Sequence, residues 1–379
     1  MDKIIPPQCI GIMGGGQLAR MLAIAAKQMG YQVAILEPDE NCPAKLFANY
    51  HIISKYDDKI GLDNLAKYSS VITTEFENVP AESMEYLKQK TLTFPKHSAI
   101  AITQDRIAEK TFFNSCDIKT TAFNAINTFS DIAQVNPNIF PAILKTNTLG
   151  YDGKGQIKVN NHTDLEQAWR VLNQVPAILE KTVVLAHEVS IMVARRQGEI
   201  SCYPVVENTH INGILDTTIA PAQISKEVVD YIEQSAKTII AKLDYIGILG
   251  IEFFITETGK ILANEMAPRP HNSGHYTLDA CMTSQFEQQL RAVCNLKLGN
   301  TKLFTNAIML NLLGDIWPEN KTPPWDKILG KYDNVKLHLY DKTEARRGRK
   351  MGHLTILGDD VSVLNKQINE IKLLLGSNY

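Results

Sequence analysis

The sequence predicts an α/β protein of two or three compact units, and three observations support this fold class. The chain has 379 residues, which is too long for one typical domain. An apolar strand at residues 9–13 is followed by a glycine loop and an amphipathic helix, which is how a doubly wound parallel sheet begins. Residues 250–266 contain two β-branched and aromatic runs around Thr258 and Gly259, which predict an antiparallel hairpin in a different sheet.

The amino-acid composition argues against nucleic-acid and membrane partners. Hydrophobic residues make up 44% and charged residues 21% of the chain, as in ordinary globular proteins. Lys and Arg (39) nearly balance Asp and Glu (41), so no global field favours nucleic acid or an acidic membrane. The six cysteines form no C-x-x-C pair, and the sequence has neither a membrane-length apolar run nor a signal peptide. We therefore expect a cytoplasmic protein whose partners are small molecules, with no nucleic acid or membrane partner.

The first glycine loop is a candidate anion site. Free backbone N–H groups at a helix start bind phosphate, and this loop lies between a strand and a helix. Gly14, Gly16 and Ala19 also fit the dinucleotide fingerprint, with Glu37 where a ribose-binding acid would lie. Because a lone match of this kind is weak evidence for NAD, it predicts only a doubly wound domain with a phosphate site.

The next strand, at residues 71–74, leads into Glu75 and Glu77. Open α/β sheets bind ligands at the carboxyl ends of their strands, so these residues are candidate ligand contacts. An acidic start of the following helix explains them equally well. Residues 98–116 are predicted to be helical and carry Arg106, for which the local sequence suggests only a surface pair.

A second glycine-rich segment follows the strand at residues 142–145. Its glycines at 150, 153 and 155 flank Lys154 and precede another strand, which predicts a mobile hairpin tip whose amides approach phosphates. The Walker A spacing is absent, and a flexible hairpin with a solvated lysine is the alternative. Further strands are predicted at 177–184, 188–194, 203–206 and 214–220, with His210 as a turn residue, and a helix at 225–243.

The hairpin at 250–266 is a candidate metal site. With its turn at residues 258–259, Glu252 lies opposite Glu265, about 5 Å away, where like charges destabilise a sheet by up to about 4 kcal/mol. A divalent cation reverses this repulsion, and two carboxylates beside Asn264 are hard oxygen ligands suited to Mg²⁺. The alternative is a solvated hairpin, but apolar residues on the same face favour the metal.

The segments after the hairpin are rich in polar side chains. The loop that follows carries Arg269, His271, Asn272, Ser273 and His275 on an irregular Pro- and Gly-rich backbone, which is typical of a functional loop. Residues 318–325 are predicted to link this part to a small terminal unit with strands near 335–339 and 354–357. The basic run at 342–350 between these strands is predicted to fold over a small phosphorylated ligand; a solvated loop and nucleic-acid contact are the alternatives.

Taken together, these segments resemble the ATP-grasp superfamily. Within it, the chain is most similar over its whole length to the N5-carboxyaminoimidazole ribonucleotide synthetases, the ATPase subunits of phosphoribosylaminoimidazole carboxylase. The most specific matches are Gly-Gly-Gly-Gln-Leu-Ala-Arg-Met, Thr-Glu-Phe-Glu-Asn-Val, Gly-Tyr-Asp-Gly-Lys-Gly-Gln, Asn-Glu-Met-Ala-Pro-Arg-Pro-His-Asn-Ser-Gly-His and Arg-Lys-Met-Gly-His. The resemblance implies a Rossmann-like domain (1–110), an ATP-grasp lid subdomain (111–185), a central α+β ATP-grasp domain (186–315) and a β-rich C-terminal domain (316–379).

The resemblance also implies a function. It is the Mg²⁺-dependent ligase reaction of ATP, bicarbonate and 5-aminoimidazole ribonucleotide in purine biosynthesis, through carboxyphosphate, in a homodimer. The implied catalytic residues are Lys154, Arg269 and Lys350, and the implied metal ligands are Glu252 and Glu265. ATP would be held by Arg106, Lys145, Gly150, Tyr151, Asp152, Gly153, Lys154, Gly155, Gln156, Glu180, Lys181, Thr182, Val183, Glu188, His210, Asn264 and Glu265. The ribonucleotide would be held by Gly15, Gln17, Leu18, Glu75, Tyr151, Asp152, Lys154, His271, Asn272, Ser273, Lys342, Arg349 and Lys350.

Other functions remain open at this point. A formate-dependent glycinamide ribonucleotide transformylase or a biotin carboxylase would share the ATP residues and differ in the acceptor pocket. An NAD-dependent dehydrogenase would explain the first loop and Glu37 but nothing after residue 140. A non-catalytic nucleotide-binding regulator would keep Lys145 and the second glycine loop without needing Arg269 or Lys350.

Overall fold

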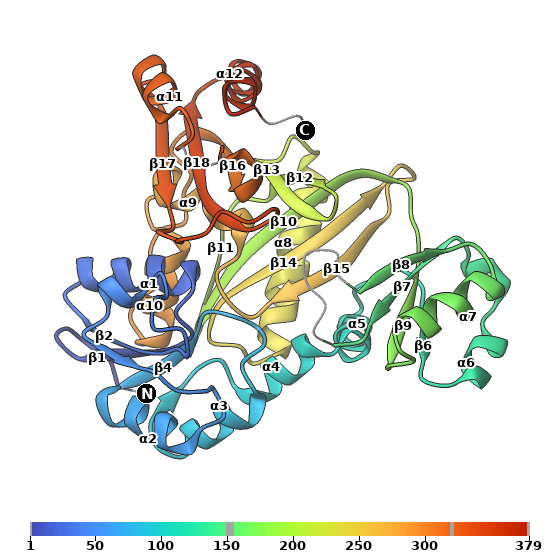
Figure 1. The fold of residues 1–379 in the computed structure, drawn as a ribbon, viewed down its shortest axis with the longest axis horizontal. Helices are drawn as coiled ribbons and strands as arrows, with labels where there is room; N and C mark the ends of the chain where they lie inside the picture. Colours follow the sequence, from blue (N-terminus) through green and yellow to red (C-terminus); the bar gives the residue numbers. More distant parts are fainter. Residues whose placement is uncertain (1, 149–154, 319–321, 377–379) are drawn as a thin grey trace.

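The computed structural model describes residues 2–148, 155–318 and 322–376, which form three sheets covered by helices (Figure 1). The first sheet is parallel, with strand order β3-β2-β1-β4-β5, as predicted for a doubly wound domain. Its central strands are short and buried because helices cover both faces. They are β1 (Cys9–Met13), β2 (Gln32–Leu36), β3 (Tyr50–Ile52), β4 (Val71–Thr74) and β5 (Leu92–Thr93), with helices α1 (Gln17–Gln28), α2 (Lys59–Tyr68), α3 (Ala81–Lys88) and α4 (His97–Gln104).

The second sheet, here called the lid sheet, is antiparallel with order β6-β9-β7-β8. Its elements are β6 (Phe123–Ile126), β7 (Ala142–Thr146), β8 (Gln156–Val159), β9 (Ala177–Lys181), α6 (Phe129–Gln134) and α7 (His162–Val171). The lid sheet has its own core, in which Trp169 packs with Leu144, Leu165 and Leu179. It therefore forms a separate lobe, on the right in Figure 1.

The third sheet has nine strands in the order β15-β14-β10-β12-β13-β16-β18-β17, with β11 paired to β10. Its strands are β10 (Leu185–Arg196), β11 (Glu199–Cys202), β12 (Val206–Ile211), β13 (Ile214–Ala220), β14 (Gly247–Thr256), β15 (Ile261–Ala267), β16 (Asn306–Leu313), β17 (Val335–Leu339) and β18 (Lys350–Gly358). Because β16 (before residue 315) pairs with β18 (after it), this sheet runs through the predicted boundary at 315/316. The domain limits inferred from the sequence stay a prediction.

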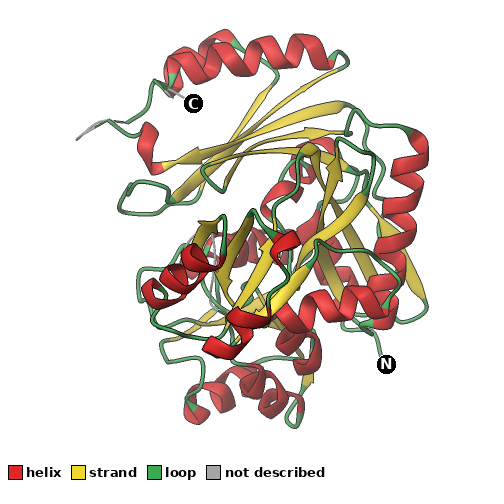
Figure 2. Cartoon of the chain, turned by 90° about the vertical axis from the view of Figure 1, so that its right-hand side faces the viewer, coloured by secondary structure: helices red, strands yellow, loops and turns green. Residues whose placement is uncertain are grey.

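Helices join these layers. The remaining ones are α5 (Arg106–Ser115), α8 (Lys226–Lys242), α9 (Thr277–Ala280), α10 (Gln285–Val293), α11 (Trp325–Lys331) and α12 (Val361–Leu374), with short 3₁₀ turns η1 (Lys45–Phe47), η2 (Pro137–Ile139), η3 (Asn272–Gly274) and η4 (Gly314–Ile316). Helix α8 packs on β10 and β14. Helix α12, next to the C-terminus, lies along β16 and β18, as the turned view in Figure 2 shows at the top. Helix α10 packs on α1, so the large sheet is anchored to the first domain.

Two local predictions are wrong. Residues 98–116 form two helices, because Asp105 is extended (φ −120°) and its side chain caps α5 by accepting from the Ala108 N–H at 2.8 Å. Residues 203–205 connect β11 to β12 instead of forming a strand. His210 lies within β12 and is not the predicted turn residue. The turn follows at Asn212 and Gly213, which have positive φ (52° and 78°).

Candidate functional site

The hairpin of β14 and β15 brings the two predicted metal ligands together through a β-bulge. Phe253 pairs with Ala263 and Ile251 with Met266, so both Asn264 and Glu265 face the single residue Glu252. The predicted one-to-one pairing of Glu252 and Glu265 is thus corrected by one inserted residue. Asn264 Nδ2 donates to Glu252 Oε2 at 3.4 Å.

Electrostatics at this hairpin favour a bound cation. Burial raises the pKa of Glu252, and the neighbouring Glu265 carboxylate raises it further. Within the described residues, no group of three or more His, Cys, Asp or Glu side chains could hold a metal ion. The pair of carboxylates nevertheless fits a divalent cation that takes its other ligands from phosphate or water, because the cation would relieve the repulsion between them.

Helix α5 fixes the second strand of this hairpin. Arg106 Nη1 lies 3.5 Å from Glu265 Oε2, which gives this arginine a role that the local sequence did not reveal. One turn later, Glu109 accepts the Met266 N–H at 2.7 Å, and Lys110 Nζ donates to the Asn264 carbonyl at 3.0 Å. Both Glu109 and Lys110 are buried. The start of α5 therefore holds Asn264 and Glu265 in place.

A buried ion cluster links α5 to the lid sheet. Glu180 Oε2 lies 3.1 Å from Lys110 Nζ, and Glu180 Oε1 lies 3.2 Å from Lys145 Nζ. Burial alone would raise the pKa of Glu180, but the two ammonium groups outweigh it and hold this pKa at about 2. Burial lowers the pKa of Lys145. The cluster thus carries two lysines and one ionised carboxylate, which leaves net positive charge for a phosphate.

Lys110 was not among the site residues predicted from the sequence. It lies four residues after Arg106, so a helical wheel would have placed both cations on one face of α5.

A cavity of about 420 Å³ opens between the lid sheet and the tip of the hairpin. It is lined in part by Thr121, Lys181, Val183 and Leu262, two of which were predicted ATP contacts. The neighbouring Thr182 is less available, because its N–H already donates to the Pro141 carbonyl at 3.0 Å. The mixed apolar and polar lining suits a heteroaromatic ring beside backbone polar groups.

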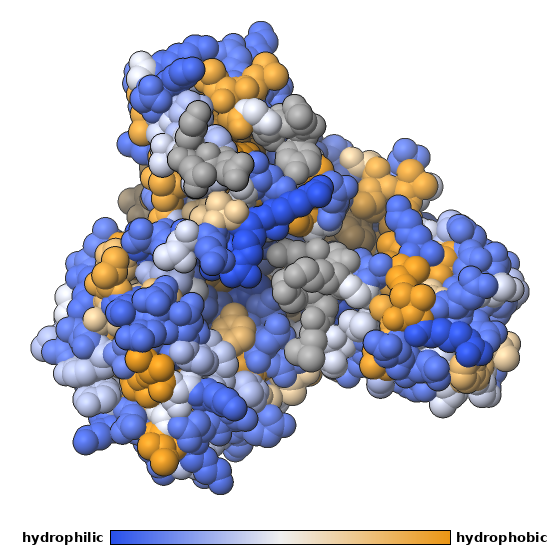
Figure 3. All heavy atoms as spheres, in the orientation of Figure 1, coloured by the Kyte–Doolittle hydropathy of each residue, from blue (hydrophilic) through white to orange (hydrophobic). Residues whose placement is uncertain are grey.

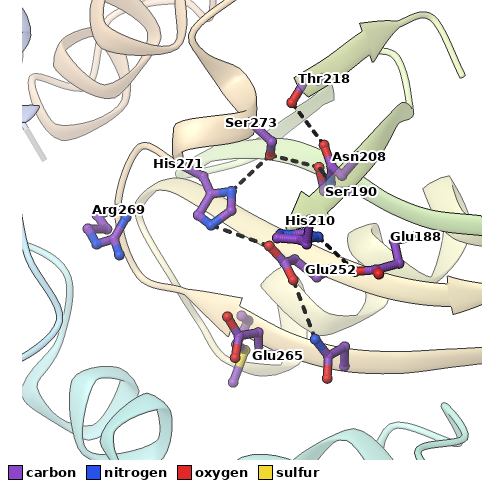
Figure 4. Close-up of polar contacts among 12 residues, drawn as sticks. Glu188, Ser190, Asn208, His210, Thr218, Glu252, Glu265, Arg269, His271 and Ser273 are labelled. Carbon is purple, nitrogen blue, oxygen red and sulfur yellow. Dashed lines mark hydrogen bonds and ion pairs between the residues drawn. The ribbon is translucent and has the colours of Figure 1, made fainter. Parts of the chain in front are cut away.

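Glu188 and His210 lie beside the hairpin. His210 Nδ1 is 2.8 Å from Glu188 Oε2 across the pair of β10 and β12. Burial would lower the pKa of His210, but the carboxylates of Glu188 and Glu252 outweigh it and raise this pKa. Figure 4 shows His210 between these two glutamates.

The loop after β15 supplies further groups to the same region. Arg269 Nε donates to Glu77 Oε2, so Glu77 rather than Glu75 faces this loop. Burial would raise the pKa of Glu77, but Arg269 holds it at about 2. His271 Nε2 lies 3.6 Å from Glu252 Oε1, and the buried Asn272 amide nitrogen has no hydrogen-bond partner among the described residues. The loop therefore carries a fixed cation and, within the described residues, one N–H donor without a partner.

The first glycine loop differs from the prediction. The Gly15 N–H donates to Glu37 at 2.9 Å, while the N–H groups of Gly16 and Ala19 donate to Glu75 at 2.9 and 3.2 Å. The prediction of free amides at Gly15 is wrong because carboxylates of the chain itself neutralise the helix start.

This arrangement bears on two other predictions. Glu37 also accepts from the Tyr56 hydroxyl at 2.5 Å, so its carboxylate is already occupied and the dinucleotide interpretation fails. Gln17 and Leu18 begin α1 beside this loop, and their predicted substrate contacts stay predictions.

The terminal basic loop is braced within the chain. Lys342 Nζ donates to the Lys350 carbonyl at 2.7 Å, and Arg349 Nη1 donates to the Glu344 carbonyl at 2.8 Å. His353, three residues after Lys350, packs its ring 4.7 Å from that of His275. His353 of β18 thereby packs on the 269–275 loop, and Figure 3 shows strongly hydrophilic residues at the centre of this face, between the lobes.

Part of the predicted site lies outside the described residues, namely Gly150, Tyr151, Asp152, Gly153 and Lys154. Gly155 has φ +70° and accepts the Thr146 N–H at 3.1 Å, while Gln156 pairs with Lys145 between β8 and β7. In the part of the chain that the structure describes, no helix is both long and apolar enough to cross a membrane. The described site therefore joins Lys145, Glu180, the β14–β15 hairpin and the 269–275 loop.

Comparisons with known proteins identify the three parts of the chain. Residues 8–104 match the ribonucleotide synthetase preATP-grasp domain, residues 111–286 the ATP-grasp domain, and residues 307–367 the phosphoribosylaminoimidazole carboxylase C-terminal domain. The chain is 45% identical over 361 residues to an N5-carboxyaminoimidazole ribonucleotide synthase of Brucella melitensis, covering 94% of this chain and 98% of that protein.

Solved structures agree with this result. The ADP complex of an N5-carboxyaminoimidazole ribonucleotide synthetase has a TM-score of 0.93 and 38% identity, with full coverage of both chains. A structure of the synthase from Aspergillus clavatus with ADP and 5-aminoimidazole ribonucleotide has a TM-score of 0.90 and 29% identity, covering 97% of this chain and 98% of that one.

Proposed function

The chain belongs to the N5-carboxyaminoimidazole ribonucleotide synthase family of ATP-grasp enzymes, and on this basis we propose which of its residues hold each reactant. It is an ATP-dependent ligase of purine biosynthesis. It carboxylates 5-aminoimidazole ribonucleotide with bicarbonate and releases ADP and phosphate.

ATP lies between the lid sheet and the central hairpin. The observation that carries this proposal is the buried cluster in which Lys110 and Lys145 share Glu180, because its net positive charge needs an anion. Lys145 and Arg106 contact the phosphates, and the cavity lined by Lys181 and Val183 takes the purine ring. Glu188 and His210 complete the nucleotide site beside the hairpin.

Glu252 and Glu265 hold Mg²⁺, with Asn264 beside them. Their opposed carboxylates fit the ion, and Arg106 balances the charge of Glu265 when no ion is bound. When bound, the ion neutralises charge on the phosphoryl group that is transferred.

The acceptor site lies between the first domain, the 269–275 loop and the terminal basic loop. Arg269, fixed by Glu77, offers positive charge to bicarbonate, and the Asn272 amide nitrogen, which has no partner in the described part of the chain, offers an N–H donor. Lys350 and Arg349 contact the ribonucleotide, and Glu75 shapes the glycine loop by capping α1. Arg269 is fixed by its ion pair with Glu77 before substrate binds, as electrostatic stabilisation requires.

The reaction proceeds in two steps. A bicarbonate oxygen attacks the γ-phosphorus of ATP, which forms carboxyphosphate and releases ADP. The exocyclic amine of the ribonucleotide then takes the carboxyl group, loses a proton and leaves phosphate as the second product. The surrounding loops exclude water, which protects the short-lived carboxyphosphate.

Labelled bicarbonate tests this sequence of steps. With ¹⁸O-bicarbonate, carboxyphosphate formation leaves one ¹⁸O atom in the phosphate product, which mass spectrometry measures. Unlabelled phosphate formed together with carboxylated product would refute the carboxyphosphate step. The Lys145→Ala variant tests the site assignment, because it should raise KM for ATP more than KM for the ribonucleotide.

We also propose that the protein works in the cytoplasm as a homodimer. The six cysteines are free and five of them are buried, as suits a reducing compartment. Light scattering after size exclusion should give twice the chain mass of 42.3 kDa, whereas a single-chain mass would contradict the dimer.

A further inference from the structure

Four buried side chains form a hydrogen-bonded row that ends at the partly buried His271 (Figure 4). Thr218 Oγ1 donates to Asn208 Oδ1 at 3.0 Å, and Asn208 Nδ2 donates to Ser190 Oγ at 2.8 Å. Ser190 Oγ lies 2.7 Å from Ser273 Oγ, which lies 2.8 Å from His271 Nδ1. Ser190, Ser273 and Thr218 are fully buried, so each of their hydroxyl hydrogens needs an acceptor within the protein.

The strand register explains how this row forms. Ser190 of β10 pairs with Glu252 of β14, and Asn208 of β12 pairs with Thr218 of β13. Ser190 and Asn208 are diagonal neighbours, because Ser190 pairs with Val206, two residues before Asn208. The row therefore crosses the same face of the sheet that carries Glu252.

The row has only one direction that satisfies every member. Ser190 Oγ already accepts from the Asn208 amide, so its own hydrogen goes to Ser273. Ser273 then donates its hydrogen to His271 Nδ1, which must be unprotonated. In the opposite direction, Ser190 would accept from both neighbours and its buried hydroxyl hydrogen would have no acceptor in the row.

The other side of the imidazole supports the same tautomer independently. His271 Nε2 faces Glu252 Oε1 at 3.6 Å. A proton on Nε2 is attracted to this carboxylate, whereas a lone pair on Nε2 would be repelled by it. With Asn264 Nδ2 at the other oxygen, the Glu252 carboxylate then faces an N–H group on each side.

We propose that Ser190 and Asn208 are positioning residues that hold His271 as its Nε2–H tautomer and thereby orient the Glu252 carboxylate. Neither residue belongs to a motif identified in the sequence, and both are buried. The consequence for catalysis rests on the proposed role of Glu252, but the tautomer itself does not. Partners that orient a ligating side chain in this way typically change activity or metal affinity by about 10–100-fold when they are removed.

Nitrogen NMR of ¹⁵N-histidine-labelled protein tests the tautomer, with His271 assigned from the His271→Asn variant. In the wild type, the chemical shifts should show an unprotonated Nδ1 and a protonated Nε2. Asn208→Asp should give the opposite tautomer, with the proton on Nδ1. The introduced carboxylate can only accept, so Ser190 would donate to it, Ser273 would donate to Ser190, and His271 Nδ1–H would donate to Ser273. Ser190→Ala should mix the two tautomers, and Ser190→Thr, which keeps the hydroxyl, should restore the wild-type one.

Ser235→Ala is the matched control, because Ser235 is also a buried serine but lies on α8, outside the row. It should leave the His271 shifts and kcat unchanged, whereas kcat should fall about tenfold or more in Asn208→Asp and Ser190→Ala. Unchanged His271 shifts in both variants would overturn the row, and altered shifts with wild-type kcat would overturn its role in positioning. A wild-type protein without carboxylation activity would instead refute the proposed function, with the tautomer still measurable.

Discussion

Glu180→Gln tests whether the buried ion cluster stabilises the attachment of the lid sheet to α5. Glu180 is 4% exposed and ion-paired to both Lys110 and Lys145. A fall in the pKa of Glu180 from 4.5 to about 2 corresponds to about 3 kcal/mol of stabilisation of the folded protein at neutral pH. Because the folded-state pKa is the lower one, this stabilisation is present above pH 4.5 and is lost as the pH falls toward 2. Removing the charge also leaves two buried ammonium groups without a carboxylate, which costs about 3–5 kcal/mol.

Urea unfolding at pH 7 measures this loss. With Trp317 and Trp325 replaced by Phe, the fluorescence of Trp169 reports the lid sheet, in whose core this residue lies. The free energy of unfolding of the lid should fall by about 3 kcal/mol or more in Glu180→Gln. Glu166→Gln is the control on the same lobe, because it breaks an exposed pair with Arg170 and should cost about 0.5 kcal/mol or less. Equal small losses in the two variants would refute the assigned strength of the cluster.

Three further predictions follow from individual residues. Glu265→Gln should abolish turnover of Mg-ATP while circular dichroism stays unchanged; wild-type turnover would remove Glu265 from the metal site. Burial and the Glu265 carboxylate raise the pKa of Glu109 to about 8, so the metal-free protein should lose stability as pH rises from about 4.5 to 8, and Glu109→Gln should flatten that slope in thermal melts. Lys350→Ala should lower kcat/KM for the ribonucleotide tenfold to a hundredfold, from a charge-assisted contact of about 1.5–3 kcal/mol, with ATP affinity by calorimetry unchanged.

Helices and strands that carry a clear hydrophobic pattern within their own residues could be predicted from the sequence. Strand β1 is a continuous apolar run, β4 is a run of β-branched residues, and α8 has an apolar stripe at helical spacing, so the positions of these elements could be predicted directly. The break at Asp105 was also visible in principle, because an Asp three residues before Ala108 is a helix-capping signal. It was missed because the apolar pattern continues on both sides.

Contacts between distant segments could not be predicted in this way. A glycine loop at a helix start predicts N–H donors, but only the fold shows that Glu75, 59 residues beyond Gly16, accepts from them. The ion partner of Lys110 is Glu180, which lies on another lobe. The bulge opposite Glu252 shifts the register by one residue, which a symmetric hairpin pattern does not reveal.

The row of Ser190, Asn208 and Thr218 could not be predicted from the sequence for a related reason. Each residue lies singly on a different strand, and only the register of three strands brings them together. The terminal strands β17 and β18 likewise join the central sheet through pairing of β18 with β16, which depends on a strand edge that the sequence does not identify.

The most direct test of the whole account is release of ADP by the purified protein with Mg-ATP and bicarbonate while the acceptor is varied. The family assignment predicts that 5-aminoimidazole ribonucleotide stimulates ADP release and is converted to its N5-carboxylated form in equal amount. Glycinamide ribonucleotide with formate, and biotin, should give no stimulation, because they are acceptors of other ATP-grasp enzymes. Stimulation by either of these, or ADP release that is indifferent to the aminoimidazole ribonucleotide, would contradict the account.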